Sequence, residues 1–275
     1  LIFLFVSFVC PSPLLDVKPW EPEKRTDKSA IKLHESFLKE TRKNGSKIQI
    51  VFHGDSQIQG WNGAGKEVWQ NHYAPLHAVN YGIGGDRTQH IIWRMKHGEI
   101  DGLNPKVVVL KIGGNNLGHG HTDQEIAQGI KEIIDIVHQK LPNTKLLLMG
   151  MFPRGSHNGG LAYDGPTRNI NKFISKYAND TRVIFLDIGP HLRSEDGQHI
   201  KSDLYSADGV HLSKKGYEVW AEKMNPVLKN ASFTIPNYAK TIADEAYWIS
   251  RMQIPNGESM DYVVPQSKSY NSDFP

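Results

Sequence analysis

Residues 47–56 read KIQIVFHGDS, a short apolar run that ends abruptly in a glycine followed by two polar residues. Four later stretches share this pattern of a β-rich apolar run followed by a Gly- or Pro-containing turn. They lie at 77–81, 106–112, 145–151 and 182–188. Near-continuous apolar runs of this length are typical of strands buried on both faces. The sequence therefore predicts five strands in the interior of one sheet.

Amphipathic segments separate the predicted strands. Apolar residues recur at helical spacing over 124–140 and 214–228, with Asp123 and Ser213 as the expected N-caps. Further helices are expected at 30–42, 66–73, 88–97 and 167–177. Such alternation predicts an α/β fold, a three-layer α/β/α sandwich around a flavodoxin-like five-stranded parallel sheet.

Composition excludes several classes of protein. The 275-residue chain has one Cys, which cannot form a disulfide framework or a Cys-based zinc finger. Its formal net charge of +3 gives no indication of nucleic-acid binding. A mean hydropathy of −0.47 with one short apolar run excludes a multi-span membrane protein. We expect no nucleic-acid partner and no stable membrane span.

Three polar clusters should meet at the edge where the carboxyl ends of parallel strands lie. Ser56 follows the first predicted strand, Gly85 the second and Asn115 the third. A serine becomes a nucleophile when a base takes its proton, and an Asn amide can donate to an oxyanion. Each cluster alone has a structural alternative, namely helix capping for Ser56 and turn chemistry for the other two.

Two further motifs in these clusters are weaker. Gly82-Ile83-Gly84-Gly85 begins like a dinucleotide fingerprint, but Arg87 stands at its sixth position, so NAD binding is rejected. His119 and His121 form an H-x-H pair, yet spacing fixes no third ligand nearby. We interpret that pair as a flexible rim loop, with no metal.

The fourth cluster is Asp208-Gly209-Val210-His211. Its carboxylate can accept from the imidazole Nδ1–H, which fixes the tautomer and leaves Nε2 as a base. The chain has 13 His, so this motif alone is weak, and a surface turn before the next helix is the structural alternative.

The order Ser, Gly, Asn, Asp-His resembles that of the SGNH (GDSL-type) hydrolases. The likeness runs from about 47 to 228 and is most specific at 74–100, 104–116 and 146–155. Over these stretches the chain is similar to the catalytic subunits of intracellular platelet-activating-factor acetylhydrolase. GDSQ replaces GDSL around Ser56, and GGNN replaces the commoner G-T-N-[DN].

The resemblance implies a role for each residue. Ser56 would be the nucleophile, His211 the general base and Asp208 the group that orients the base. The N–H groups of Ser56 and Gly85, with the Asn115 side chain, would form the oxyanion hole. The implied reaction is two-step removal of a small acyl group, expected to be acetyl, without metal or organic cofactor. A phospholipid-like ester and an acetylated glycan are the two substrate classes, and a homodimer is expected.

The two ends of the chain favour export. Residues 1–12 resemble the remainder of a signal peptide, which predicts a secreted protein with a hydrolase domain at 13–230. N-x-[ST] sequons add support at Asn44, Asn179 and Asn230. A partly irregular extension is expected at 231–275. Its Tyr- and Pro-bearing sequence motivates an alternative, a secreted matrix or binding protein that keeps the hydrolase fold without needing its activity.

Overall fold

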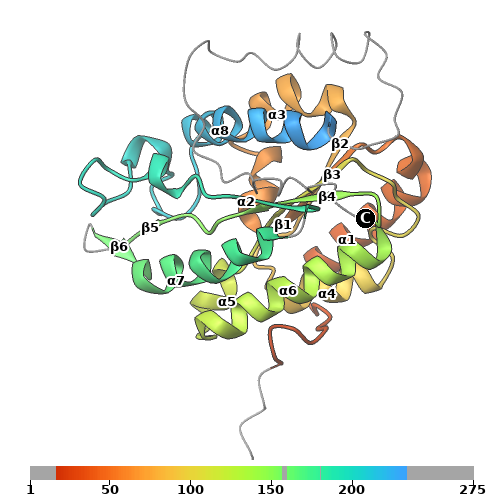
Figure 1. Ribbon diagram of the computed structural model, residues 1–275, viewed down its shortest axis with the longest axis horizontal. Coiled ribbons are helices and arrows are strands. Elements are labelled where there is room, and N and C mark those ends of the chain that lie inside the picture. Colours follow the sequence, from red (N-terminus) through yellow and green to blue (C-terminus); the bar gives the residue numbers. More distant parts are fainter. Residues whose placement is uncertain (1–16, 157–159, 180, 234–275) are drawn as a thin grey trace, which may run out of the picture.

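The structure, a computed structural model, describes residues 17–156, 160–179 and 181–233 (Figure 1). The predicted signal segment at 1–12 lies outside the described residues, and so does the extension from residue 234 onward. In the part of the chain that is described, no helix combines the length and the apolar character needed to cross a bilayer.

A five-stranded parallel sheet forms the middle layer (Figure 1). The strands lie in the order β2-β1-β3-β4-β7. Their bounds are Ile50–Gly54 (β1), Ala78–Gly82 (β2), Val107–Lys111 (β3), Lys145–Met149 (β4) and Val183–Leu186 (β7). Numbered along the chain, this is the 2-1-3-4-5 order of a flavodoxin-like sheet. The predicted fold class is confirmed.

Strand side chains alternate between two separate cores. In β1, Ile50 and Phe52 belong to one core and Val51 to the other; in β3, Val109 and Val108 divide in the same way. All five of these residues are fully buried. This burial on both faces explains why the strands read as continuous apolar runs rather than as an alternating pattern.

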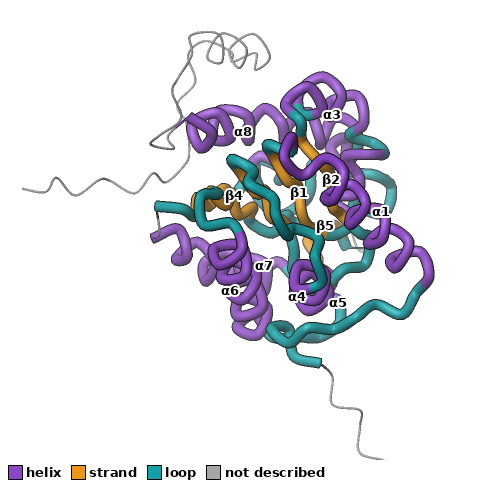
Figure 2. The backbone as a smooth tube through the Cα atoms, turned by 90° about the vertical axis from the view of Figure 1, so that its right-hand side faces the viewer, coloured by secondary structure: helices purple, strands orange, loops and turns teal. Residues whose placement is uncertain are grey.

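Helices cover both faces of the sheet (Figures 1 and 2). On one face lie α3 (Lys66–His72) and α8 (Lys214–Phe233). They share an aromatic core with Phe52, Trp61 and Trp220. On the other face lie the helices that pack around an isoleucine-rich core: α1 (Lys28–Asn44), α4 (Thr88–Lys96), α6 (Asp123–Lys140) and α7 (Asp164–Ile174).

Local details differ from the sequence predictions in a few places. The N-cap of α6 is Thr122, not Asp123: its hydroxyl accepts from Glu125 N, and Glu125 accepts from Thr122 N, a complete capping box. Ser213 does precede α8, and its hydroxyl accepts from Gly216 N at 3.2 Å. A small hairpin, β5 (Arg154–Gly155) with β6 (Leu161–Ala162), was not predicted because its strands are only two residues long.

Candidate active site

Ser56 follows the carboxyl end of β1, an interior strand between β2 and β3, and takes the first position of the short helix α2 (Ser56–Gln59). Asp55 caps this helix by accepting from Gln57 N at 2.9 Å. Gly54 is required before the turn, since a β-carbon there would lie 2.1 Å from the Lys111 carbonyl oxygen of β3. The half-buried serine therefore stands where the strand order reverses, the usual ligand edge of such a sheet.

His211 joins Ser56 to Asp208. Its Nε2 lies 2.9 Å from Ser56 Oγ, and its Nδ1 lies 2.6 Å from Asp208 Oδ2. The other carboxylate oxygen, Oδ1, accepts from the N–H groups of Val210 and His211. With the Nδ1 proton directed at the carboxylate, Nε2 is left to accept from the serine hydroxyl. The structure thus brings together the three residues that lie up to 155 positions apart.

Asp208 is exposed, with half of its side chain accessible, rather than buried behind the imidazole. Desolvation acts to raise the pKa of this carboxyl. Hydrogen bonds from the His211 side chain and from the N–H groups of His211 and Val210 outweigh it and lower the pKa to about 2. The carboxylate is therefore charged at neutral pH and can stabilise a positive imidazole.

Gln57, the residue that departs from the GDSL pattern, links the nucleophile turn to the histidine loop. Its Nε2 donates to the Val210 carbonyl oxygen at 2.5 Å, and its own carbonyl oxygen accepts from Tyr217 OH at 2.7 Å. These two bonds connect the residue after Ser56 to the residue before His211 and to α8. The departure in sequence thus supplies a contact that a leucine could not make.

The other two predicted oxyanion residues, Gly85 and Asn115, lie in the turn after β2 and in the helix after β3. A β-carbon built on Gly84 would lie 3.8 Å from Ser56 Cβ, so the Gly84-Gly85 turn passes next to the serine. Gly85 is exposed and has a φ of +80°, a conformation that favours glycine. Asn115 lies in α5 (Gly114–Gly118), and its Nδ2 donates to the Asp86 carbonyl oxygen at 2.8 Å. One amide proton therefore binds the neighbouring loop, which leaves the second for a ligand.

A buried ionic network supports this loop, and sequence reasoning missed it. Arg94 pairs with Asp86 at 2.8 Å and also contacts Glu99. Glu99 further accepts from His53 and His34, and the carboxylates of Asp86 and Glu99 are fully buried. Burial raises the pKa of Asp86 to about 6 against the opposing charges of Arg94 and Arg25. The sequence had predicted only that residues 88–97 form a helix.

The structure buries His121 and leaves His119 exposed in the turn after α5. α5 continues to Gly118, and His121 is only 9% exposed. The two rings lie 5.6 Å apart between centroids. α5 packs against α6, and the pair therefore combines one buried ring with one exposed ring.

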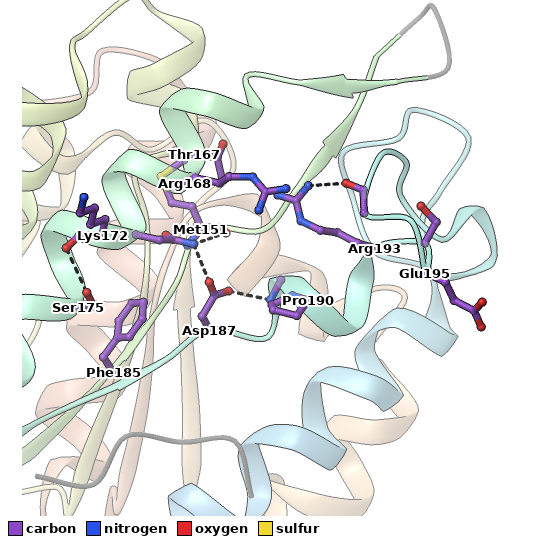
Figure 3. A pocket seen from close by; sticks show the side chains of 14 residues that line it. Met151, Thr167, Arg168, Lys172, Ser175, Phe185, Asp187, Pro190, Arg193 and Glu195 are labelled. Atoms are coloured by element: carbon purple, nitrogen blue, oxygen red, sulfur yellow. Dashed lines mark hydrogen bonds between the residues drawn. The ribbon is translucent and has the colours of Figure 1, made fainter.

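A separate cavity of about 570 Å³ lies between α7 and the end of β7 (Figure 3). Its half-buried carboxylate, Asp187, accepts from Asn171 Nδ2 at 3.1 Å and from Gly189 N at 2.8 Å. Burial raises the pKa of Asp187 in spite of these bonds. Asn171 also binds the backbone of Met151, so its side chain connects the segment after β4 to the segment after β7. We assign this cavity no chemical role.

Comparison with known proteins agrees with the geometry. Residues 52–219 match the model of the GDSL-like Lipase/Acylhydrolase family. Over 208 residues, 75% of this chain, it is 36% identical to platelet-activating factor acetylhydrolase IB subunit alpha1 of Bos taurus and of Homo sapiens, covering 82% and 83% of those proteins.

Solved structures share the fold at lower identity. A GDSL-like lipase from Bacteroides thetaiotaomicron superposes with a TM-score of 0.58 at 16% identity, over 72% of this chain and 99% of that one. An acetyl xylan esterase superposes with a TM-score of 0.53 at 22% identity, over 66% and 100%. The fold, the family match and the relatives lead to one conclusion: the chain belongs to the GDSL-like lipase/acylhydrolase family and is a carboxylic ester hydrolase.

Proposed function

We propose that this chain is a serine esterase that removes a small acyl group, most simply acetyl, through a covalent acyl-enzyme. The observation that carries the proposal is the hydrogen-bonded row in which Asp208 contacts His211 at 2.6 Å and His211 contacts Ser56 at 2.9 Å. A serine beside an oriented base is the arrangement that acyl transfer requires.

In the first step Ser56 Oγ attacks the ester carbonyl carbon while its proton passes to His211 Nε2. The carbonyl oxygen becomes an anion, and the N–H groups of Ser56 and Gly85 with Asn115 Nδ2 donate to it. Asp208 stabilises the imidazolium that forms. The bond to the alcohol then breaks, and His211 gives its proton to the leaving oxygen.

In the second step water takes the place of the alcohol. His211 accepts a proton from the water as it attacks the acyl carbon, the same donors bind the second oxyanion, and the proton returns to Ser56 as the acid leaves. Loss of one oxyanion donor typically lowers the rate by about 100- to 1,000-fold.

The name of the relatives supports one class of substrate. Their name, platelet-activating factor acetylhydrolase, supports an acetyl ester of a phospholipid-like alcohol. An acetylated glycan is the second candidate, motivated by the apolar run at residues 1–9 and the three sequons, which support export.

Intact-mass analysis of the naturally produced protein, before and after glycosidase treatment, tests both export and glycan attachment. Light scattering tests the expected homodimer.

Turnover of p-nitrophenyl acetate by the full chain tests the reaction. We expect the wild type to show a burst of p-nitrophenolate, and Ser56→Ala to have no turnover above the buffer rate. The rates with butyrate and octanoate esters then show how long an acyl chain the site accepts. Acetate release from xylan or pectin, against release from a lipid acetyl ester, decides between the substrate classes. A Ser56→Ala variant as active as wild type would overturn the proposal.

A further inference from the structure

The guanidinium group of Arg154 lies against Gly114, the residue before the proposed oxyanion donor Asn115. A β-carbon built on Gly114 would lie 2.0 Å from Arg154 Nη2 and 3.2 Å from its Cζ. The cation therefore covers the residue that immediately precedes Asn115, and the lack of a side chain at Gly114 makes room for it.

The backbone on either side of Arg154 is fastened to the loop that carries Asp208 and His211. Gly155 N donates to the Gly209 carbonyl oxygen at 2.8 Å. On the other side, the Pro153 carbonyl oxygen accepts from Tyr205 OH at 2.7 Å. Arg154 thus lies between Gly114 and the loop that carries Asp208 and His211, and these two hydrogen bonds hold its neighbours to that loop.

The charge of Arg154 has no counterpart in the protein. The nearby carboxylates have cationic partners of their own, since Asp55 pairs with Lys111 at 3.4 Å and Asp208 with His211 at 2.6 Å. Within 17–156, 160–179 and 181–233, no residue forms a hydrogen bond or ion pair with the Arg154 side chain. A positive charge that the protein does not neutralise favours a site for an anionic group.

Arg154 also lines a cavity of about 1060 Å³ that runs along the loop before His211. The loop residues Asp208, Gly209 and Val210 form part of its wall. The rest of the lining includes apolar side chains, among them Ala162, Tyr163 and Ile200. The cavity joins a cation to an apolar surface next to the triad, so it can hold more of a substrate than an acetyl group.

We propose that Arg154 is a specificity-determining residue that binds a phosphate or carboxylate on the alcohol part of the ester. This inference rests on the proposed esterase function and deepens it: the substrate class becomes acyl esters whose leaving alcohol is anionic. A guanidinium forms paired, charge-assisted hydrogen bonds to either anion, and a lysine ammonium cannot reproduce that fork.

The test uses two matched pairs of acetyl esters that differ in one charge. One pair is 1-O-butyl-2-acetylglycerol 3-(methyl phosphate), which is a monoanion, and the corresponding neutral 3-(dimethyl phosphate). The other is 4-acetoxybenzoate and its methyl ester. We expect wild type to prefer the charged member of at least one pair, and the pair that responds identifies phosphate or carboxylate. The Arg154→Gln variant should lower that preference, as a ratio of kcat/KM, by about 10- to 100-fold, mainly through KM.

Two more variants separate recognition from folding. Arg154→Lys should regain part of the preference, because it keeps the charge without the fork. The matched control is Arg168→Gln, which removes an exposed guanidinium on α7 that pairs with Asp164; it should keep the wild-type ratio. The inference is overturned if the ratio of Arg154→Gln stays within twofold of wild type, or if wild type prefers neither charged ester. In those cases neutral esters are still cleaved, whereas no turnover of any ester would overturn the esterase function as well.

Discussion

Arg25, in the segment before α1, donates from Nη1 to the carbonyl oxygen of Gly84 at 3.1 Å. The same nitrogen donates to Asp86 Oδ1 at 3.0 Å, so the arginine binds the residues immediately before and after Gly85. Gly85 is exposed and adopts a φ of +80°. Arg25 adds to the bonds that hold its neighbours, in which Asn115 donates to Asp86 and Gly84 donates to the Gln59 side chain. The position of this proposed oxyanion donor therefore depends on a residue remote in sequence.

Replacement of Arg25 by Gln should lower kcat by about tenfold and leave KM nearly unchanged, because a misdirected N–H weakens transition-state stabilisation more than substrate binding. Steady-state kinetics on p-nitrophenyl acetate provide the measurement. Arg42→Gln, which removes an exposed arginine in the last turn of α1, is the control and should match wild type. An equal kcat in Arg25→Gln and wild type would show that the loop holds its shape unaided.

Asp208→Asn should lower kcat/KM by about 1,000- to 10,000-fold while the fold persists. An amide can still accept from Val210 N and His211 N through its oxygen, so the loop should survive. Its NH₂ group, however, would face Nδ1 and favour the tautomer that carries the proton on Nε2, which then cannot accept from Ser56. Circular dichroism checks the fold.

The matched control for that substitution is Asp203→Asn. Asp203 is exposed in the same region and pairs with Lys215 at 2.5 Å. Its loss should change the rate by less than twofold, since surface pairs contribute little. A loss of under tenfold for Asp208→Asn would mean that His211 is oriented by other groups.

Gly54→Ala should destabilise the fold by about 1–3 kcal/mol or more, because the new methyl group would clash with backbone rather than with a movable side chain. The β-carbon would lie 2.1 Å from the Lys111 carbonyl oxygen and 2.6 Å from Ile58 Cγ1. Gly118→Ala is the control, since a β-carbon there meets nothing within 4 Å. Urea unfolding measures both; equal midpoints would show that β1 and β3 can separate at this point without cost.

The apolar runs predicted the sheet because strands buried on both faces leave a strong signal. Ser56 and Asn115 could be placed together from the same reasoning, since parallel strands deliver their carboxyl ends to one edge. His211 was harder to place, because it follows no predicted strand. Its position depends on the path of the loop before α8, which the D-x-x-H motif and the family likeness indicated.

The supporting residues could not be predicted. Arg25 and Gly84 are 59 positions apart, and no periodicity connects them. Arg94 and Glu99 carry charged side chains, yet both are buried. Such pairs arise only when the packing of α1 and α4 against the sheet closes off water, which is a property of the assembled fold.

His53 belongs to this buried network and gives it a pH dependence. The side chain is fully buried, and its Nε2 lies 2.9 Å from Glu99 Oε2. Burial and the charge of Arg94 lower the pKa of His53 to about 4, against the opposing hydrogen bond and charge of Glu99. An ordinary histidine titrates near 6.5. The folded chain therefore keeps His53 neutral where the unfolded chain takes up a proton.

The sign of the effect follows from proton binding. Between pH 6.5 and about 4 the unfolded state holds the extra proton, so His53 makes the free energy of unfolding fall as the pH is lowered. The slope approaches about 1.4 kcal/mol per pH unit in the middle of that range. Asp86 acts in the opposite direction, because its pKa is raised to about 6. Asp86 remains in a His53 variant, so its contribution cancels in the difference.

The expected result is that His53→Gln is less stable than wild type at pH 7, by about 1–3 kcal/mol for a disturbed buried hydrogen bond, yet loses less further stability between pH 7 and 5. Urea unfolding at pH 7, 6 and 5 measures both quantities. His97→Gln removes an exposed imidazole stacked on Trp93 and should keep the wild-type slope. Parallel pH profiles for His53→Gln and wild type would show that His53 does not titrate on unfolding, and that the acid sensitivity of the fold arises elsewhere.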